Sequence, residues 1–146
     1  MQYWLLLLHA GVTCFMCGLI WLVQVVHYPL FAQVGRAEFA EYQRRHMQRT
    51  SWVVAAPMCL EGVTAVALLI WPPVGVSLVW LWVSFVALIA IWASTFFLQV
   101  PRHEELLRAF DSAVHQFLVR SNWLRTLLWS ARALLMLFLI HKALPQ

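Results

Sequence analysis

The sequence predicts an all-α integral membrane protein, folded as an up-down-up-down four-helix bundle with two amphipathic interfacial helices on one side. Of its 146 residues, 63% are hydrophobic and 11% are charged. A soluble domain carries about 25% charged residues, so this composition indicates a chain that lies in a lipid bilayer. Four long apolar runs are joined by short polar or proline-containing stretches. We therefore expect one membrane domain over residues 1–146.

The first expected span covers residues 3–26. It begins without a charged segment, and its apolar run is longer than a signal-peptide core, so we expect it to be retained. Pro29 is expected to end this helix. Small residues recur at steps of four, at Ala10, Cys14 and Gly18. Such a ridge suits close helix packing within the bundle or between copies, so a homo-oligomer is one expected assembly.

Two amphipathic segments, residues 35–51 and 102–120, are expected to form helices at the membrane interface. Their arginines are Arg36, Arg44, Arg45, Arg49, Arg102, Arg108 and Arg120. The side that carries the termini has only Lys142 and the α-amino group. The positive-inside rule therefore predicts that the charged connections are cytoplasmic and both termini are outside. We interpret the net charge of +4 as a signal for membrane topology. We expect no nucleic-acid partner.

The second expected span covers residues 52–71, and the third covers residues 74–100. The second contains Glu61 well inside its apolar run. Because a carboxylate in the hydrocarbon layer is costly, Glu61 is a candidate functional residue. A Trp-Pro-Pro turn at residues 71–73 separates the two spans. The third span is apolar apart from a few serine and threonine side chains.

The fourth expected span covers residues 122–141 and carries two arginines in an otherwise apolar run. A polar stripe follows steps of three and four through Asn122, Arg125, Trp129, Arg132 and Met136. On a helix this spacing places all five on one face. Arginine facing lipid near the midplane is costly, so we expect the stripe to face the interior of the bundle.

Depth along the helices predicts an ion pair between Glu61 and Arg132. Glu61 lies nine positions after Trp52, and Arg132 lies nine positions after Trp123. At about 1.5 Å per residue both are roughly 13 Å into the membrane from the same side. This pair is either structural or catalytic. Arg125 is shallower and lacks an obvious carboxylate, so a bound anion, phenolate or polarised carbonyl would suit it.

Histidines on the side of the charged connections are candidate metal ligands or bases. They are His27, His46, His103 and His115. Together with Glu61 they are candidates to hold one or two transition-metal ions. Interface-facing histidines and a cofactor-free site are the other interpretations. His9 and His141, at the opposite side, would have to face each other to bind haem.

The two halves of the chain show a weak likeness to each other. Residues 22–25, with His27 after them, resemble residues 97–100, with His103 after them. Each is followed by an amphipathic segment and then by another span. This pattern is typical of a parallel internal repeat about an axis normal to the membrane.

The start of the fourth span carries a motif. Its residues are His115, Asn122, Trp123, Arg125, Thr126, Trp129 and Arg132. This pattern resembles the anthrone-oxygenase-like family of small four-span membrane proteins, and the likeness in span layout covers the whole chain. Residues 27–61 look like a bacterial subgroup, so we expect a bacterial inner membrane.

The resemblance implies oxidation of an activated aromatic carbanion by dioxygen, which turns an anthrone into a quinone. A base (Glu61, His27 or His46) would remove a carbon-bound proton, and Arg125 and Arg132 would stabilise the resulting enolate. The expected ligand is a hydrophobic aromatic or quinone-like molecule. The residues expected to bind it are Asn122, Trp129, Gln24 and Gln99. The alternative is a non-catalytic carrier or assembly subunit with a structural Glu61–Arg132 pair. A cavity beside the arginine stripe would favour the enzyme.

Overall fold

The structure is a computed structural model that describes residues 2–144. Within these residues it is helical and has no strand. Its elements are α1 (Gln2–Leu22), η1 (Val23–His27), α2 (Tyr28–Leu30), η2 (Phe31–Gln33), α3 (Phe39–Ile70), α4 (Leu78–Ser94), η3 (Thr95–Gln99), α5 (Val100–Leu106) and α6 (Ser112–Ala143). They join into four continuous helical rods, each long and apolar enough to cross a membrane. The protein is therefore an integral membrane protein of the predicted class.

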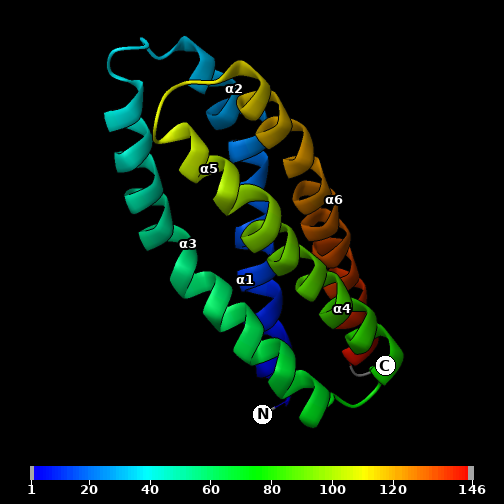
Figure 1. The fold of residues 1–146 in the computed structure, drawn as a ribbon. Coiled ribbons are helices and arrows are strands. Elements are labelled where there is room, and N and C mark those ends of the chain that lie inside the picture. Colours follow the sequence, from blue (N-terminus) through cyan, green and yellow to red (C-terminus); the bar gives the residue numbers. More distant parts are fainter. Residues whose placement is uncertain (1, 145–146) are drawn as a thin grey trace.

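The four rods form the predicted up-down-up-down bundle. α1 packs against α3 and α6, and α4 packs against α3 and α6, so rods that are adjacent in sequence are adjacent in space. The N-terminal end of α1, the C-terminal end of α6 and the α3–α4 connection lie at one end of the bundle (Figure 1). The two charged connections lie at the other end. This arrangement confirms the predicted placement of termini and connections on opposite sides.

Pro29 does not end the first rod, contrary to the prediction. The helix continues to Gln33 because a π-helical turn, η1, precedes the proline. In this turn the Tyr28 N–H donates to the Val23 carbonyl, five residues back. The wider turn provides room for a proline ring, which in a regular helix collides with a preceding carbonyl. The third rod has the same feature, because the π-helical turn η3 precedes Pro101.

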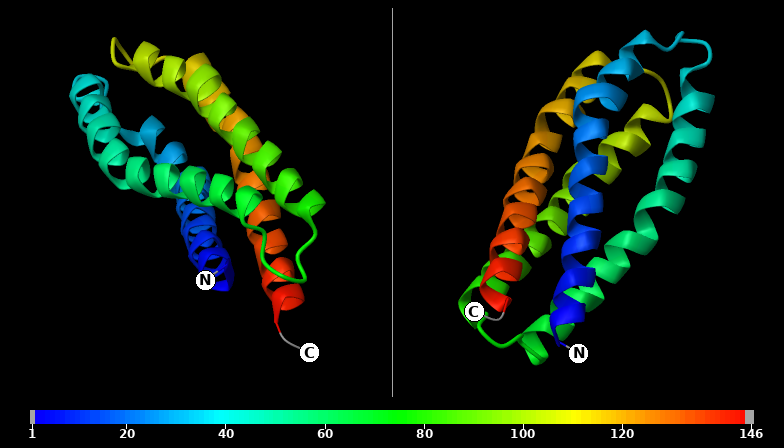
Figure 2. Two further views of the ribbon diagram at one scale, coloured as in Figure 1. Left: turned by 90° about the horizontal axis from the view of Figure 1, so that it is seen from below. Right: turned by 180° about the vertical axis from the view of Figure 1, so that it is seen from behind.

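The amphipathic segments extend the rods and do not form separate helices, which corrects that part of the prediction. Residues 39–51 are the first turns of α3, which continues without a break to Ile70. α3 bends near its middle, where Pro57 lies (Figure 2). Residues 102–120 are divided between α5 and α6 by a turn. Asp111 caps α6 there, because its carboxylate accepts the Ala113 and Val114 N–H groups at 2.7 and 3.0 Å.

The two halves share one order of elements, which supports the predicted repeat. Each half has a rod with a π turn and a proline, a short turn (residues 34–38 or 107–111), and a helix of 32 residues. The π turns begin at Val23 and Thr95, an offset of 72 residues (95 − 23). The likeness between the two halves of the sequence predicts a different offset, in which Gln24 corresponds to Gln99. The structural repeat therefore has a different residue alignment.

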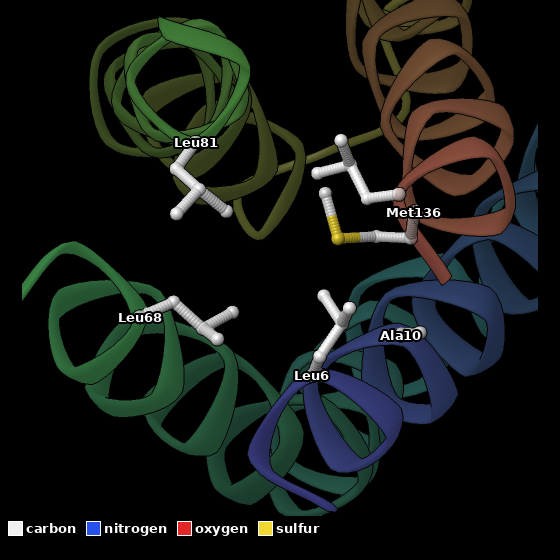
Figure 3. Packing of buried hydrophobic residues seen from close by; sticks show 6 residues of the cluster. Leu6, Ala10, Leu68, Leu81 and Met136 are labelled. Carbon is white, nitrogen blue, oxygen red and sulfur yellow. The ribbon is translucent and has the colours of Figure 1, made fainter. Parts of the chain in front are cut away.

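Three layers of apolar side chains lie along the bundle axis. At the end with the termini, all four rods contribute to one cluster, in which Leu6, Leu68, Leu81 and Met136 converge (Figure 3). A middle cluster is built around Trp129, and a third lies near the charged connections. The α3–α4 turn is held close to the end of α6 by Gly75, whose φ of 80° favours glycine. A Cβ there would lie 2.8 Å from the Lys142 carbonyl oxygen.

The outer surface matches a lipid environment. Large apolar side chains such as Trp4, Val63, Val79 and Phe97 are more than half exposed. In a soluble monomer an apolar surface of this extent would be a liability for aggregation. The three cysteines, at positions 14, 17 and 59, are free thiols.

Candidate functional site

The polar stripe of the fourth rod is buried, as predicted. Asn122, Arg125, Trp129, Arg132 and Met136 are each 7% exposed or less. They all lie on α6, which begins ten residues before the expected start of the span at residue 122. The stripe therefore faces the inside of the bundle over several helical turns. Its two arginines have different surroundings, which divide the interior into two parts.

Arg132 forms the predicted buried ion pair with Glu61. Its Nη1 donates to Glu61 Oε1, and both side chains are 1% exposed or less. Its Nε donates to the carbonyl and hydroxyl oxygens of Ser84 at 3.0 and 3.2 Å. Glu61 also accepts hydrogen bonds from Thr13 Oγ1 at 2.9 Å and Trp129 Nε1 at 3.2 Å. The pair and its hydrogen-bonded partners thus come from all four rods.

His9 completes the ion-pair network. Arg132 Nη2 lies 3.2 Å from His9 Nε2, and an arginine can only donate, so Nε2 is the acceptor. His9 Nδ1 then carries the proton and donates to Thr64 Oγ1 at 2.7 Å. The Thr64 hydroxyl in turn donates to the Leu60 carbonyl. His141 is exposed at the end of α6, so the histidine pair considered for haem does not meet.

Protein groups enclose the Glu61 carboxylate. Three donors occupy both of its oxygens, and the side chain is 0% exposed. It does not line the large cavity described below, and the Trp129 indole lies between them, since it both lines the cavity and donates to Glu61. This geometry matches the interpretation of a pair that stabilises the bundle. A free base would need an unoccupied oxygen that faces the ligand.

A cavity of about 390 Å³ lies beside the shallower arginine. It is bounded by α3 on one side and by α4, η3 and α5 on the other, with α1 and α6 behind. One part of its wall is apolar and aromatic: Met16, Ile20, Val54, Met58, Trp92, Phe96 and Trp129. The other part is polar: Tyr28, His46, Thr50, Thr95, Gln99, His103 and Arg125. The cavity thus has an apolar body and a polar end.

Arg125 lies at the polar end without an acidic partner. Its guanidinium donates to Asn122 Oδ1, and to Thr95, Tyr28 and Gln99 oxygens at 3.3 Å each. No carboxylate lies within 4.0 Å of it in the described part of the chain. All its partners are neutral, although the side chain is only 7% exposed. A buried cation with neutral partners attracts an anion or a polarised oxygen.

Tyr28 and His103 continue the polar end from Arg125. The Tyr28 hydroxyl oxygen lies 2.8 Å from His103 Nε2. On the other side of the imidazole, Gln43 Nε2 lies 2.8 Å from His103 Nδ1 and 3.1 Å from the His103 carbonyl oxygen. Tyr28 is 3% exposed and Gln43 is fully buried. The order of contacts is therefore Arg125, Tyr28, His103 and Gln43.

His27 and His46 form a second pair near the polar end. His27 Nε2 lies 2.7 Å from His46 Nδ1, and Thr50 Oγ1 lies 3.1 Å from the same nitrogen. The rings of His46 and His103 are 5.2 Å apart between centroids. His46 and His103 both line the cavity, whereas His27 is behind His46. The hydrogen-bond pattern leaves His46 Nε2 without a partner within residues 2–144.

The five candidate metal ligands do not converge. His27, His46 and His103 lie close together, but Glu61 belongs to the ion-pair network. His115 donates through Nε2 to the Tyr28 carbonyl oxygen at 2.8 Å. No group of three or more His, Cys, Asp or Glu side chains has a metal-binding arrangement among the described residues. The predicted set of five is thus split between three places.

The two predicted glutamines lie on either side of the stripe. Gln24 accepts from Asn122 Nδ2 at 2.8 Å and donates to the Val119 carbonyl at 3.2 Å. It does not line the cavity. Gln99 lines it, accepts from Arg125 and donates to Ser121 at 2.8 Å. Gln99 is therefore placed to contact a ligand, and Gln24 orients Asn122.

Three residues of the polar end, Tyr28, Thr50 and Thr95, were not identified from the sequence, nor was Gln43, which contacts His103 from behind. Gln43 had a detectable signal, because Phe39, Gln43, His46 and Thr50 follow steps of three and four on one helix face. Tyr28 and Thr95 lie after or within π turns. Such turns rotate the helix face away from regular periodicity, so no pattern in the sequence indicated these two.

Comparison with known proteins gives no relative to which this chain can be assigned. No family model, curated protein or solved structure matches it.

Proposed function

We propose that the protein is a membrane-embedded oxidoreductase that binds a flat, hydrophobic aryl ketone or quinone-like molecule in the cavity beside Arg125. The observation that carries the proposal is this buried arginine, which faces a cavity of about 390 Å³ without a carboxylate partner. A charge in this position is costly unless it serves a ligand. The likeness of the fourth span to the anthrone-oxygenase-like family points in the same direction.

The cavity wall supports an aromatic ligand. Trp92, Phe96 and Trp129 provide flat apolar surfaces, and methionine side chains adapt to irregular shapes. Binding sites for small molecules typically combine such walls with a few polar groups that orient the ligand. Here the polar groups are gathered at one end. A ligand with one polar oxygen and a hydrophobic ring system matches this division.

The polar end supports formation of an enolate. In this proposal His46 donates through Nδ1–H to His27 Nε2, which leaves the lone pair of His46 Nε2 for a substrate proton. Removal of a proton from the carbon activated by the ketone places negative charge on the ketone oxygen. Arg125 stabilises that charge. His46 is thus the proposed base, and His27 positions it.

Dioxygen is the oxidant in the proposed reaction. The enolate donates electrons to dioxygen, so that a ring CH₂ group becomes a carbonyl. One oxygen atom enters the product, and the other leaves as water with the two hydrogen atoms of the CH₂ group. For an anthrone the product is an anthraquinone. The apolar cavity admits dioxygen and excludes water from the carbanion.

The proposed location is a bacterial inner membrane, with the charged connections on the cytoplasmic side. The arginines of these connections support this orientation by the positive-inside rule. The polar end of the cavity is built from residues near the same end of the bundle. A proton taken up by His46 would therefore exchange through His27 with the cytoplasmic surface, and a proton returns when water forms, so that no net proton is released.

Substitution of Arg125 tests the proposed function. Arg125→Met is expected to lower kcat/KM for anthrone at least 100-fold, measured as dioxygen uptake and as quinone absorbance above the protein-free rate. Loss of one preorganised charge-stabilising group has effects of this order. Arg120→Met is the matched control, because Arg120 is exposed on the same helix, and it should retain activity. A wild-type protein that does not exceed the protein-free rate with anthrone would reject the oxidase.

A non-catalytic carrier is the second candidate function. It is favoured by the Glu61–Arg132 network, which protein groups fully satisfy and which needs no ligand. A carrier would bind anthrone and anthraquinone in the same cavity without turnover. Binding that depends on Arg125, in the absence of dioxygen uptake, would select this function.

A further inference from the structure

The hydrogen-bond partners of Tyr28 determine where its proton points. Its hydroxyl oxygen lies 3.3 Å from Arg125 Nη2 and 2.8 Å from His103 Nε2. Arginine only donates, so the first contact uses a lone pair of the tyrosine oxygen. The second contact has two possible directions. Which one occurs depends on whether His103 carries its proton on Nε2 or on Nδ1.

Gln43 selects the tautomer of His103. Its side-chain nitrogen contacts both His103 Nδ1 and the His103 carbonyl oxygen. An inverted amide would place Oε1 at 3.1 Å from that carbonyl oxygen, and two acceptors repel. The amide nitrogen therefore donates to both atoms, and Nδ1 is unprotonated. His103 then carries its proton on Nε2 and donates it to Tyr28.

The Tyr28 oxygen thus accepts two hydrogen bonds, from Arg125 and His103. Both of its lone pairs are used, and its own proton has no acceptor in the described part of the chain. Tyr28 lines the cavity next to Arg125. A buried donor without a partner is costly, so a ligand in the cavity that accepts a hydrogen bond from Tyr28 would remove this cost.

We infer that Tyr28 and Arg125 form a paired binding site for one ligand oxygen, a ketone carbonyl or its enolate. The Tyr28 hydroxyl donates a hydrogen bond to this oxygen, and Arg125 supplies positive charge beside it. Gln43 and His103 are positioning residues. Gln43 selects the tautomer of His103, and His103 donates to the Tyr28 oxygen, so that the Tyr28 proton is left for the ligand. This inference rests on one part of the proposed function, namely that the ligand occupies the cavity beside Arg125.

The site selects a ligand class. A hydrocarbon of the same shape would leave the Tyr28 proton and the Arg125 charge without an acceptor. Sites built to bond a ligand oxygen discriminate strongly against analogues that lack it. Anthraquinone and anthracene have the same three fused rings and differ in the carbonyl oxygens, so this pair of probes isolates the contribution of the oxygen.

The experiment compares binding of the two probes to wild-type protein and Tyr28→Phe, read by quenching of tryptophan fluorescence. Wild-type protein should bind anthraquinone more tightly than anthracene. In Tyr28→Phe the Kd of anthraquinone should rise roughly tenfold, as expected for loss of one hydrogen bond in a buried site. The Kd of anthracene should change less than twofold, since the ring is kept. Tyr42→Phe, outside the cavity wall, is the matched control.

A second measurement does not depend on any variant at Tyr28. Histidine ¹⁵N NMR of the wild-type protein should show His103 as the Nε2–H tautomer, with the signal assigned by His103→Gln. Gln43→Met removes the amide that selects this tautomer. The spectrum should then shift toward a tautomer mixture, and the anthraquinone Kd should rise by a few-fold, while anthracene binding is unchanged.

Three results would overturn the inference: equal wild-type affinity for the two probes, unchanged anthraquinone binding in Tyr28→Phe, or a His103 Nδ1–H tautomer in wild-type protein. The proposed oxidase can fail separately. Absence of dioxygen uptake together with Tyr28-dependent selection of anthraquinone would reject the oxidase and keep the carbonyl site. Turnover of anthrone together with any of the three results above would reject the carbonyl site and keep the oxidase.

Discussion

Glu61 on α3 and Arg132 on α6 form a buried ion pair, although they are 71 positions apart in the sequence. The pair is surrounded by donors and acceptors, Thr13 and His9 on α1, Ser84 on α4 and Trp129 on α6. Arg125, two helical turns away on the same face, has no such carboxylate. The contrast between these arginines distinguishes a network closed by protein groups from the proposed ligand site.

The first prediction concerns the stability of the ion pair. Glu61→Gln should lower the free energy of unfolding by about 3–5 kcal/mol, because it leaves the Arg132 charge buried without its partner. Denaturant unfolding in mild detergent measures this change. Anthraquinone binding should persist in the folded fraction, since Glu61 does not line the cavity. Glu104→Gln, at an exposed position on α5, is the control and should be neutral.

A double substitution tests whether the loss at Glu61 is electrostatic. Glu61→Gln combined with Arg132→Met removes both charges and should recover most of the lost stability. A double variant as unstable as Glu61→Gln alone would contradict the electrostatic explanation. It would instead assign the loss to the hydrogen bonds of Thr13 and Trp129.

The second prediction concerns the wall of the cavity at Gly62. A Cβ at this position would lie 3.0 and 3.1 Å from two atoms of the Trp92 indole. Gly62→Ala should therefore displace Trp92, which lines the cavity, and weaken anthraquinone and anthracene binding together by several-fold. Gly18→Ala is the matched control, because a Cβ there meets no atom within 4 Å. It should leave binding unchanged and add about 0.5–1 kcal/mol of stability. Unaltered binding in Gly62→Ala would show that the ligand does not reach Trp92.

The third prediction separates the proposed base from the carbonyl site. His46→Gln should reduce kcat for anthrone oxidation at least 100-fold, because proton removal by a positioned base contributes about 10²–10⁴-fold. Binding of anthraquinone should change little, since its oxygen contacts Tyr28 and Arg125. His27→Gln should have a smaller effect on kcat, as His27 acts through His46. Exposed His141→Gln is the control, and full activity of His46→Gln would remove His46 from the mechanism.

Regular helical periodicity made much of the fold predictable. The apolar runs indicated four spans, and steps of three and four indicated the buried face of the last one. Counting residues from Trp52 and Trp123 placed Glu61 and Arg132 at one depth. The prediction held because α3 and α6 are continuous helices over these stretches. Along a continuous helix, depth depends only on the number of residues.

Contact among the five candidate metal ligands was less predictable, because depth along a helix does not fix the direction of a side chain. Grouping His27, His46, His103, His115 and Glu61 used only their common side of the membrane. Which side chains meet depends on the rotation of each helix about its axis. The structure turns His115 toward the Tyr28 backbone and Glu61 toward Arg132. Shared depth is thus necessary for contact but does not ensure it.

The amino-acid sequence was enough to predict the class of protein, the four rods, the placement of both termini at the end opposite the charged connections, and the Glu61–Arg132 pair. Hydropathy and the helical repeat are local properties, so they can be read from the chain. Only the packing of the rods shows that a cavity lies beside Arg125, that Tyr28 and His103 line its polar end, and that Gln43 contacts His103. Two π turns and the proline within α3 interrupt the regular helical geometry around this cavity. Which side chains meet beside these turns depends on how the rods pack together, so helical periodicity in the sequence did not reveal them.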